Sequence, residues 1–161
     1  MNIENAIYLY TELALSLAGF AGVSAAFAGR AREFRPVERL RLLGLMSLSG
    51  VVLAGCFAFI ISSTAEFSEG RVLVVTAIVS FILTFTVGII ALPTLWRRSR
   101  DADTTISQWS LYFVSGLYLA EVVLLGIPIV LPGSAWMILL GFSLLLLHGL
   151  WIFVLFLTRP N

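Results

Sequence analysis

The chain has 161 residues, of which 60% are hydrophobic and only 12% are charged, and its mean hydropathy is +1.02. Soluble domains carry about a quarter charged residues, so this composition leaves too little polar surface to cover a water-soluble globule. The formal net charge of +1 argues against nucleic acid as a partner. We therefore expect a single integral-membrane domain over residues 1–161, with the lipid bilayer as its surroundings.

Five long apolar stretches follow one another along the chain, separated by short polar connections. Each exceeds the ~20 residues that an α-helix needs to cross ~30 Å of hydrocarbon. None shows the apolar–polar alternation of a membrane β-strand, and the first lacks the basic flank and cleavage site of a signal peptide. The sequence thus predicts an all-α, polytopic transmembrane helical bundle of five spans, at about residues 5–28, 38–62, 72–96, 107–131 and 135–157.

The arginines fall almost entirely in alternate connections. Nine of the ten lie in or beside the 1–2 connection, the 3–4 connection and the C-terminal tail, and only Arg71 lies in the 2–3 connection. The positive-inside rule assigns the arginine-rich side to the cytoplasm. We expect the N-terminus outside, the C-terminus in the cytoplasm, and a multi-pass protein of the inner (plasma) membrane.

Small residues recur at helical spacing on three of the spans. Close approach of small residues drives helix association in lipid, so these rows predict packing seams and favour a homo-oligomer or a partner membrane protein. The row on the third span also carries hydroxyls, and a water-filled lumen lined by them is the alternative. The three rows are Ala14, Ala18, Gly22 and Ala26; Gly50, Ala54 and Ala58; and Thr76, Ser80, Thr84 and Gly88.

Three ionisable residues lie at membrane depth, namely Glu12, Glu121 and His148. A charge near the bilayer centre costs roughly 2.5–3.5 kcal/mol on insertion scales, so such residues need a reason to be there. Counted from the span midpoints, Glu12 lies roughly 7 Å and Glu121 roughly 3 Å outward of the centre, and His148 roughly 3 Å inward. Direct or water-bridged contact follows if the three helices adjoin.

Two interpretations of these residues stay open. Glu12 and Glu121 can share a proton, or a glutamate and His148 can form an ion pair, as part of a proton or cation pathway. Alternatively, a neutral carboxyl group is hydrogen-bonded across helices and only fixes the packing, with His148 as a packing histidine. Because Gly19 lies on the same helix face as Glu12, we expect that carboxyl to face a packed seam. The pathway candidates are Glu12, Glu121, His148, Tyr8, Tyr118 and Thr84.

The arginines of the 1–2 connection are first of all determinants of topology. They also form a candidate site for anionic lipid headgroups or a phosphorylated ligand, through Arg30, Arg32, Arg35 and Arg39.

Signatures of enzymes and cofactor sites do not occur in the sequence. Metalloprotease, P-loop, nucleophile-elbow and dinucleotide motifs are missing. One histidine and one cysteine supply neither a zinc site nor a bis-histidine haem. We expect no enzymatic activity, no catalytic residue, no metal and no cofactor. Two functions remain: a proton or cation channel or transporter-like subunit, and a non-conducting scaffold or sensor that binds a membrane protein or anionic lipid.

Overall fold

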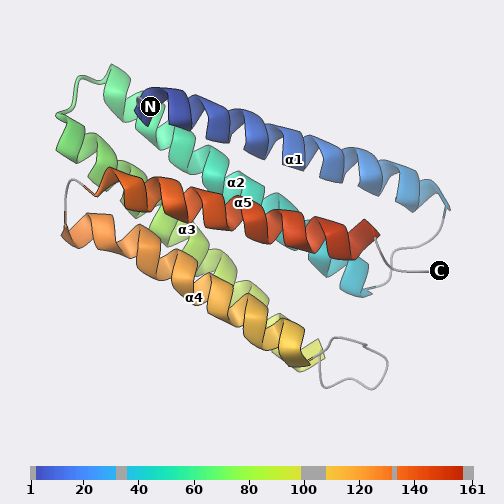
Figure 1. Ribbon diagram of the computed structural model, residues 1–161. Coiled ribbons are helices and arrows are strands. Elements are labelled where there is room, and N and C mark those ends of the chain that lie inside the picture. The colour runs from blue at the N-terminus through green and yellow to red at the C-terminus, as the bar shows by residue number, and fades with distance from the viewer. Residues whose placement is uncertain (1–2, 32–35, 99–107, 132–133, 158–161) are drawn as a thin grey trace.

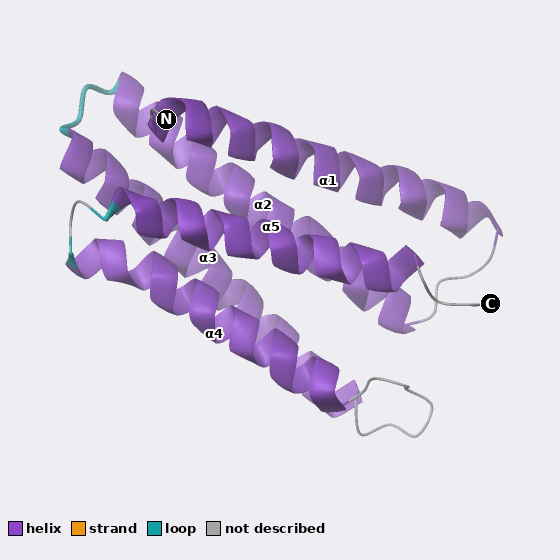
Figure 2. Cartoon of the chain, viewed as in Figure 1, coloured by secondary structure: helices purple, strands orange, loops and turns teal. Residues whose placement is uncertain are grey.

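The computed structural model describes residues 3–31, 36–98, 108–131 and 134–157. These residues form five helices: α1 (Ile3–Ala31), α2 (Pro36–Thr64), α3 (Glu69–Arg98), α4 (Gln108–Val130) and α5 (Ala135–Leu157). Within the described ranges the remaining residues form turns and short loops, without strands (Figure 2). All five helices are long and apolar enough to cross a membrane, which confirms the predicted five-span α-helical fold.

Successive helices run antiparallel (Figure 1). We call the end at which α1, α3 and α5 finish and α2 and α4 begin the arginine end, because nine of the ten arginines lie in or beside its helix ends and connections. The other end is the opposite end. Helix α2 is central and packs against α1, α3 and α5, whereas α4 packs against α3 and α5. Among the described residues, helix α1 contacts only α2 and α5 and is therefore an edge helix.

Local chemistry explains where the helices start and stop. Pro36 opens α2, where its missing N–H has no helical partner to lose. At the opposite end, Glu66 adopts a positive φ of 57°, which reverses the chain between α2 and α3. The carbonyl oxygen of Ser68 then accepts hydrogen bonds from the N–H groups of Arg71 and Val72 at 2.8 and 3.1 Å, and Glu69 in the first turn of α3 complements the helix dipole.

The predicted seam on the third span is buried. Thr76, Ser80 and Thr84 have no exposed surface. A Cβ built on Gly55 of α2 would overlap Ser80 Oγ and lie 2.5 Å from Phe142 Cζ of α5. This glycine therefore permits three helices to meet closely in the half of the bundle nearer the opposite end.

The predicted seam on α1 is only partly covered. Ala14 is fully buried, but Gly22 and Ala26 are exposed, and nothing lies within 4 Å of a Cβ built on Gly22. The stripe of α1 that does pack on the bundle holds Ile7, Ala14 and Ala21, seven residues apart. In the single chain, the small-residue face of α1 therefore mostly faces outward.

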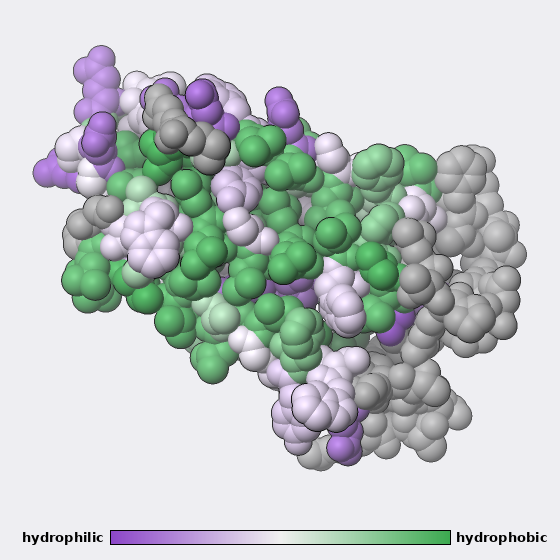
Figure 3. Space-filling view, in the orientation of Figure 1, coloured by the Kyte–Doolittle hydropathy of each residue, from purple (hydrophilic) through white to green (hydrophobic). Residues whose placement is uncertain are grey.

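The outer surface of the bundle is apolar. Large side chains such as Phe20, Ile61 and Leu119 are about two-thirds exposed, and Figure 3 shows hydrophobic residues covering the middle of the visible face, with strongly hydrophilic ones gathered mainly at the upper left. An apolar surface of this extent belongs in hydrocarbon rather than water. The protein is thus a multi-pass membrane protein.

Candidate functional site

A carboxyl–imidazole pair lies in the middle of the bundle. His148 Nδ1 of α5 lies 2.9 Å from Glu121 Oε1 of α4, and both side chains are fully buried. Glu121 belongs to the buried stripe of α4, which also contains Leu111, Tyr118 and Leu125. The regular spacing of that stripe turns the carboxyl group toward α5 rather than toward lipid.

Tyr118 completes the pair on its side facing the arginine end. It precedes Glu121 by three residues, so the two side chains share one face of α4. The ring of Tyr118 meets the ring of His148 edge to face, with centroids 5.0 Å apart. A Cβ built on Gly88 of α3 would lie 3.6 Å from Tyr118 Cδ1, an ordinary contact distance, so this ring also packs against α3. Tyr118 thus contacts both the imidazole of α5 and helix α3.

The register of α2 against α5 brings a further hydroxyl to this level. A Cβ built on Gly149 would lie 4.0 Å from the Cβ of Leu48. Since the two helices run antiparallel, the next residue of α2, Ser49, lies at the level of His148. Ser49 is fully buried.

The register of α3 against α4 brings the hydroxyl of Thr84 to this level as well. Gly88 lies opposite Tyr118, so Thr84, one turn nearer the opposite end on α3, lies close to the level of Glu121.

We call Ser49, Thr84, Glu121 and His148 the polar layer. Each of these residues carries a buried atom without a hydrogen-bond partner among the described residues. These atoms are Ser49 Oγ, Thr84 Oγ1, Glu121 Oε2 and His148 Nε2.

The protonation of the pair decides what His148 Nε2 can do. An isolated net charge is costly at low dielectric, which favours the net-neutral states of the pair. Neutral Glu121 can donate to Nδ1 or accept from Nδ1–H, depending on the imidazole tautomer, and a carboxylate can accept from an imidazolium. Nε2 is a donor in the first and third of these states and an acceptor in the second, and it has no partner among the described residues. Moving a proton between Glu121 Oε1 and Nδ1 interconverts the first and third states over 2.9 Å.

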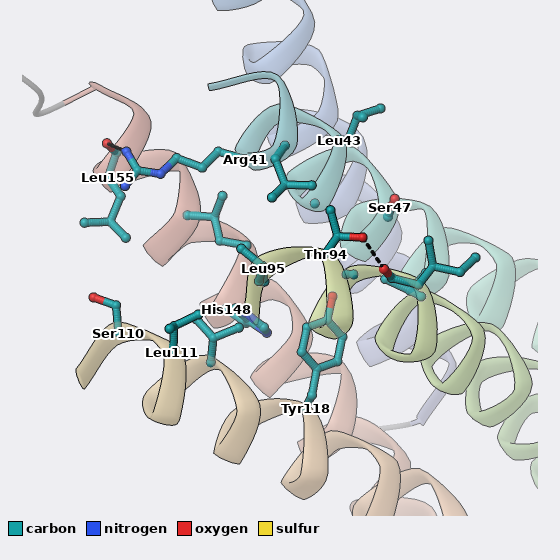
Figure 4. A pocket seen from close by; sticks show the side chains of 17 residues that line it. Arg41, Leu43, Ser47, Thr94, Leu95, Ser110, Leu111, Tyr118, His148 and Leu155 are labelled. Atoms are coloured by element: carbon teal, nitrogen blue, oxygen red, sulfur yellow. Dashed lines mark hydrogen bonds between the residues drawn. The ribbon is translucent and has the colours of Figure 1, made fainter. Parts of the chain in front are cut away.

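A pocket leads from the arginine end to this pair. It has a volume of about 480 Å³ and lies between α2, α3, α4 and α5, with Arg41 and Leu155 at its arginine end and Tyr118 and His148 at its deep end. Figure 4 shows Tyr118 reaching from α4 toward α3 across the deep end. Apolar side chains dominate the lining, with hydroxyls of Ser47, Thr94 and Ser110 between them.

The arrangement of four helices produces the pocket. Among the described residues α2 and α4 share no close contact, and the pocket lies where α3 and α5 separate them. Leu43 of α2 and Ile90 of α3 line the pocket and are 62% and 67% exposed. The pocket is therefore partly open rather than enclosed.

Some of the predicted pathway residues lie elsewhere. Glu12 is exposed in the single chain, and its face is not the one that α1 packs on α2 and α5, so the predicted seam at Glu12 is not formed by the helices of this bundle. Tyr8 is likewise 58% exposed. Direct pairing of Glu12 with Glu121 is also absent, because the bonded oxygen of Glu121 contacts His148 and the other has no partner among the described residues.

The predicted arginine site is described in part. Arg39 is exposed on α2, whereas the side chains of Arg30, Arg32 and Arg35 lie outside the described part of the chain. Sequence reasoning did not single out Arg41, whose Nη1 donates a 2.8 Å hydrogen bond to the carbonyl oxygen of Leu155. The sequence signal for Arg41 was its position two residues after Arg39, near the arginine-rich end of the second span.

Neither a metal site nor a related protein points to a function. The described residues contain no group of three His, Cys, Asp or Glu side chains placed to hold a metal ion. Comparison with protein families, with curated proteins and with solved structures found no match to this chain. The polar layer and the pocket are therefore the features from which a function can be inferred.

Proposed function

We propose that this protein is a transporter-like membrane protein in which the Glu121–His148 pair binds and releases a proton inside the bilayer. The observation that carries the proposal is the 2.9 Å contact between these two fully buried side chains. Ionisable residues at membrane depth are expensive and mark proton and ion paths. We further propose that the arginine end faces the cytoplasm, following the distribution of arginines.

The surroundings of the pair support proton exchange over a purely structural role. A pair that only fixes packing is expected to satisfy all its polar atoms, because an unsatisfied buried group costs about 1–3 kcal/mol. Here one carboxylate oxygen, one imidazole nitrogen and two hydroxyls of the polar layer are left without partners. The pocket provides a route from the arginine end to His148.

Proton flux into proteoliposomes tests the proposal. A pH-sensitive dye inside the vesicles reports acidification after an imposed potential. Glu121→Gln keeps the size and hydrogen-bonding capacity of the side chain but cannot bind a proton, so flux is expected to fall at least tenfold, and His148→Gln should do the same. Glu12→Gln is the matched control, because Glu12 lies outside the polar layer. Unchanged flux in the Glu121→Gln variant would remove the pair from any pathway.

A second candidate function, a scaffold that binds another membrane protein or a second copy of this chain, is favoured by the exposed face of α1. Glu12 and Gly19 lie on this face, and nothing lies within 4 Å of a Cβ built on Gly19. A carboxyl group facing lipid is costly, and exposed glycine permits close helix approach. A partner helix packed on this face would shield the Glu12 carboxyl from lipid and could approach α1 closely at Gly19.

Analytical ultracentrifugation in density-matched detergent tests this second function. Gly19→Leu is expected to weaken a self-association that uses this face, whereas a bulky change at an equally exposed position of another helix, Gly116→Leu on α4, should not. A wild-type chain that sediments as a monomer at all concentrations and purifies from membranes without a partner would argue against a scaffold.

A further inference from the structure

We infer that the pocket at the arginine end binds an acidic phospholipid, with one acyl chain between α2 and α3 and the phosphate group at Arg41. The pocket shares His148 with the proton-binding pair, but the lipid test changes only Arg41 and Ala91 and measures lipid binding rather than proton flux. Its failure is therefore distinguishable from failure of the proposed function.

The lining of the pocket suits a hydrocarbon chain. Leu40, Leu95, Val114 and Ile152 form much of its wall, and the volume of about 480 Å³ lies within the ~300–1,000 Å³ of ordinary ligand pockets. Apolar cavities of this kind hold apolar guests in preference to water. Because Leu43 and Ile90 at its rim are largely exposed to the outside of the bundle, a chain can enter from the bilayer without crossing water.

The depth of the pocket matches one leaflet. Arg41 lies at its arginine end, and its deep end is at the level of Ser49, eight residues further along α2 and therefore about 12 Å away. Half of a ~30 Å hydrocarbon core is about 15 Å. A lipid of the leaflet at the arginine end would thus keep its headgroup at the level of Arg41 while one chain extends toward Tyr118.

Charge selects an acidic headgroup. Arg41 is half-buried at the mouth of the pocket, and the donation of its Nη1 to the carbonyl of Leu155 is one of its contacts with the protein. These contacts orient the guanidinium, whose planar fork of N–H groups suits a phosphate. The concentration of arginines at the same end of the bundle adds a long-range attraction for acidic lipids.

Native mass spectrometry of the full chain in detergent tests the inference. Phosphatidylglycerol and phosphatidylcholine with identical acyl chains are titrated against the wild type and two variants of the site. We expect one phosphatidylglycerol to bind in preference to phosphatidylcholine, and Arg41→Gln to weaken this binding roughly tenfold or more, as expected for loss of charge-assisted hydrogen bonds. Ala91→Leu, which fills the pocket from α3, should weaken binding of both lipids.

Arg39→Gln is the matched control, because Arg39 is two residues away on α2 but is exposed and does not line the pocket. Equal weakening by Arg39→Gln and Arg41→Gln would overturn the inference in favour of diffuse surface charge. Undiminished binding to Ala91→Leu would overturn the placement of the chain. Photocrosslinking of the wild type with a diazirine-bearing phosphatidylglycerol avoids folding defects: labelling of Leu95 or Val114 is expected, and labelling confined to exposed outer positions would contradict the site.

Discussion

The energetic coupling between Glu121 and His148 can be worked out from their surroundings. Replacing His148 by Leu leaves both oxygens of a fully buried carboxyl group without a partner among the described residues. The expected loss of stability is about 1–3 kcal/mol if the carboxyl stays neutral and about 3–5 kcal/mol if it stays charged. Glu121→Leu leaves Nδ1 of His148 unpaired, with an expected loss of about 1–3 kcal/mol.

The double replacement is expected to behave differently. With both polar groups removed, no unsatisfied atom of the pair remains, and apolar side chains of similar volume in place of a buried pair are often neutral or stabilising. The double variant should therefore be more stable than the His148→Leu variant alone. If the double variant is neutral, the sum of the two single losses is the coupling energy, which is about 2–6 kcal/mol for a neutral carboxyl and about 4–8 kcal/mol for a charged one.

Unfolding of the purified protein in mixed micelles of increasing denaturing-detergent content, followed by far-UV circular dichroism, measures the four free energies of the cycle. A parallel cycle on Leu119 and Leu147, both at least 60% exposed on α4 and α5, controls for general effects of substitution and should be additive within about 0.5 kcal/mol. Additive losses at Glu121 and His148 would refute the assignment of a direct buried contact, since independent sites do not rescue each other.

Three further outcomes follow from the packing. Gly55→Ala should destabilise the bundle by about 1–3 kcal/mol, because its Cβ would meet Ser80 Oγ and Phe142. Gly50→Ala on the same helix is the control: a Cβ there has open space, so this change should be neutral or slightly stabilising. Equal melting temperatures for the two variants would contradict the close approach at Gly55. Gly141→Ala should cost less than Gly55→Ala, because its main obstacle is the flexible end of Leu125 at 2.8 Å, and a thermal unfolding series ranks the two. Ala91→Leu should lower proton flux in proteoliposomes at least severalfold while leaving the Glu121–His148 contact intact, and undiminished flux would exclude the pocket as the access route.

The five spans and the vertical position of the buried pair could be predicted from sequence because both depend on properties of single helices. Hydrophobic length sets the number of spans, and a fixed rise of 1.5 Å per residue puts Glu121 and His148 at similar depth. The stripe of Leu111, Tyr118 and Leu125 around Glu121 also carries the periodicity of a packed face. These signals do not depend on how the helices are arranged.

The direction in which Glu12 points depended on that arrangement. Residues Ile7, Ala14 and Ala21 recur every seven positions on α1, and so do Glu12, Gly19 and Ala26. The second row contains a glycine, which favours close helix approach, but in the described part of the chain α1 contacts only α2 and α5, and the first row is the one they cover. An edge helix has one face for its own bundle and another for its surroundings, and small residues suit either. The pocket could not be predicted for the same reason, since it depends on how four helices are arranged.

The deep end of the pocket lies against the polar layer. Tyr118 and His148 form the deep end of the pocket, so an acyl chain that reaches them excludes water from the side of the imidazole that faces the arginine end. Bound lipid therefore opposes proton access to His148 from that end. An acidic lipid at Arg41 would then act as a plug that holds the pair dry, and its departure would open the route to His148.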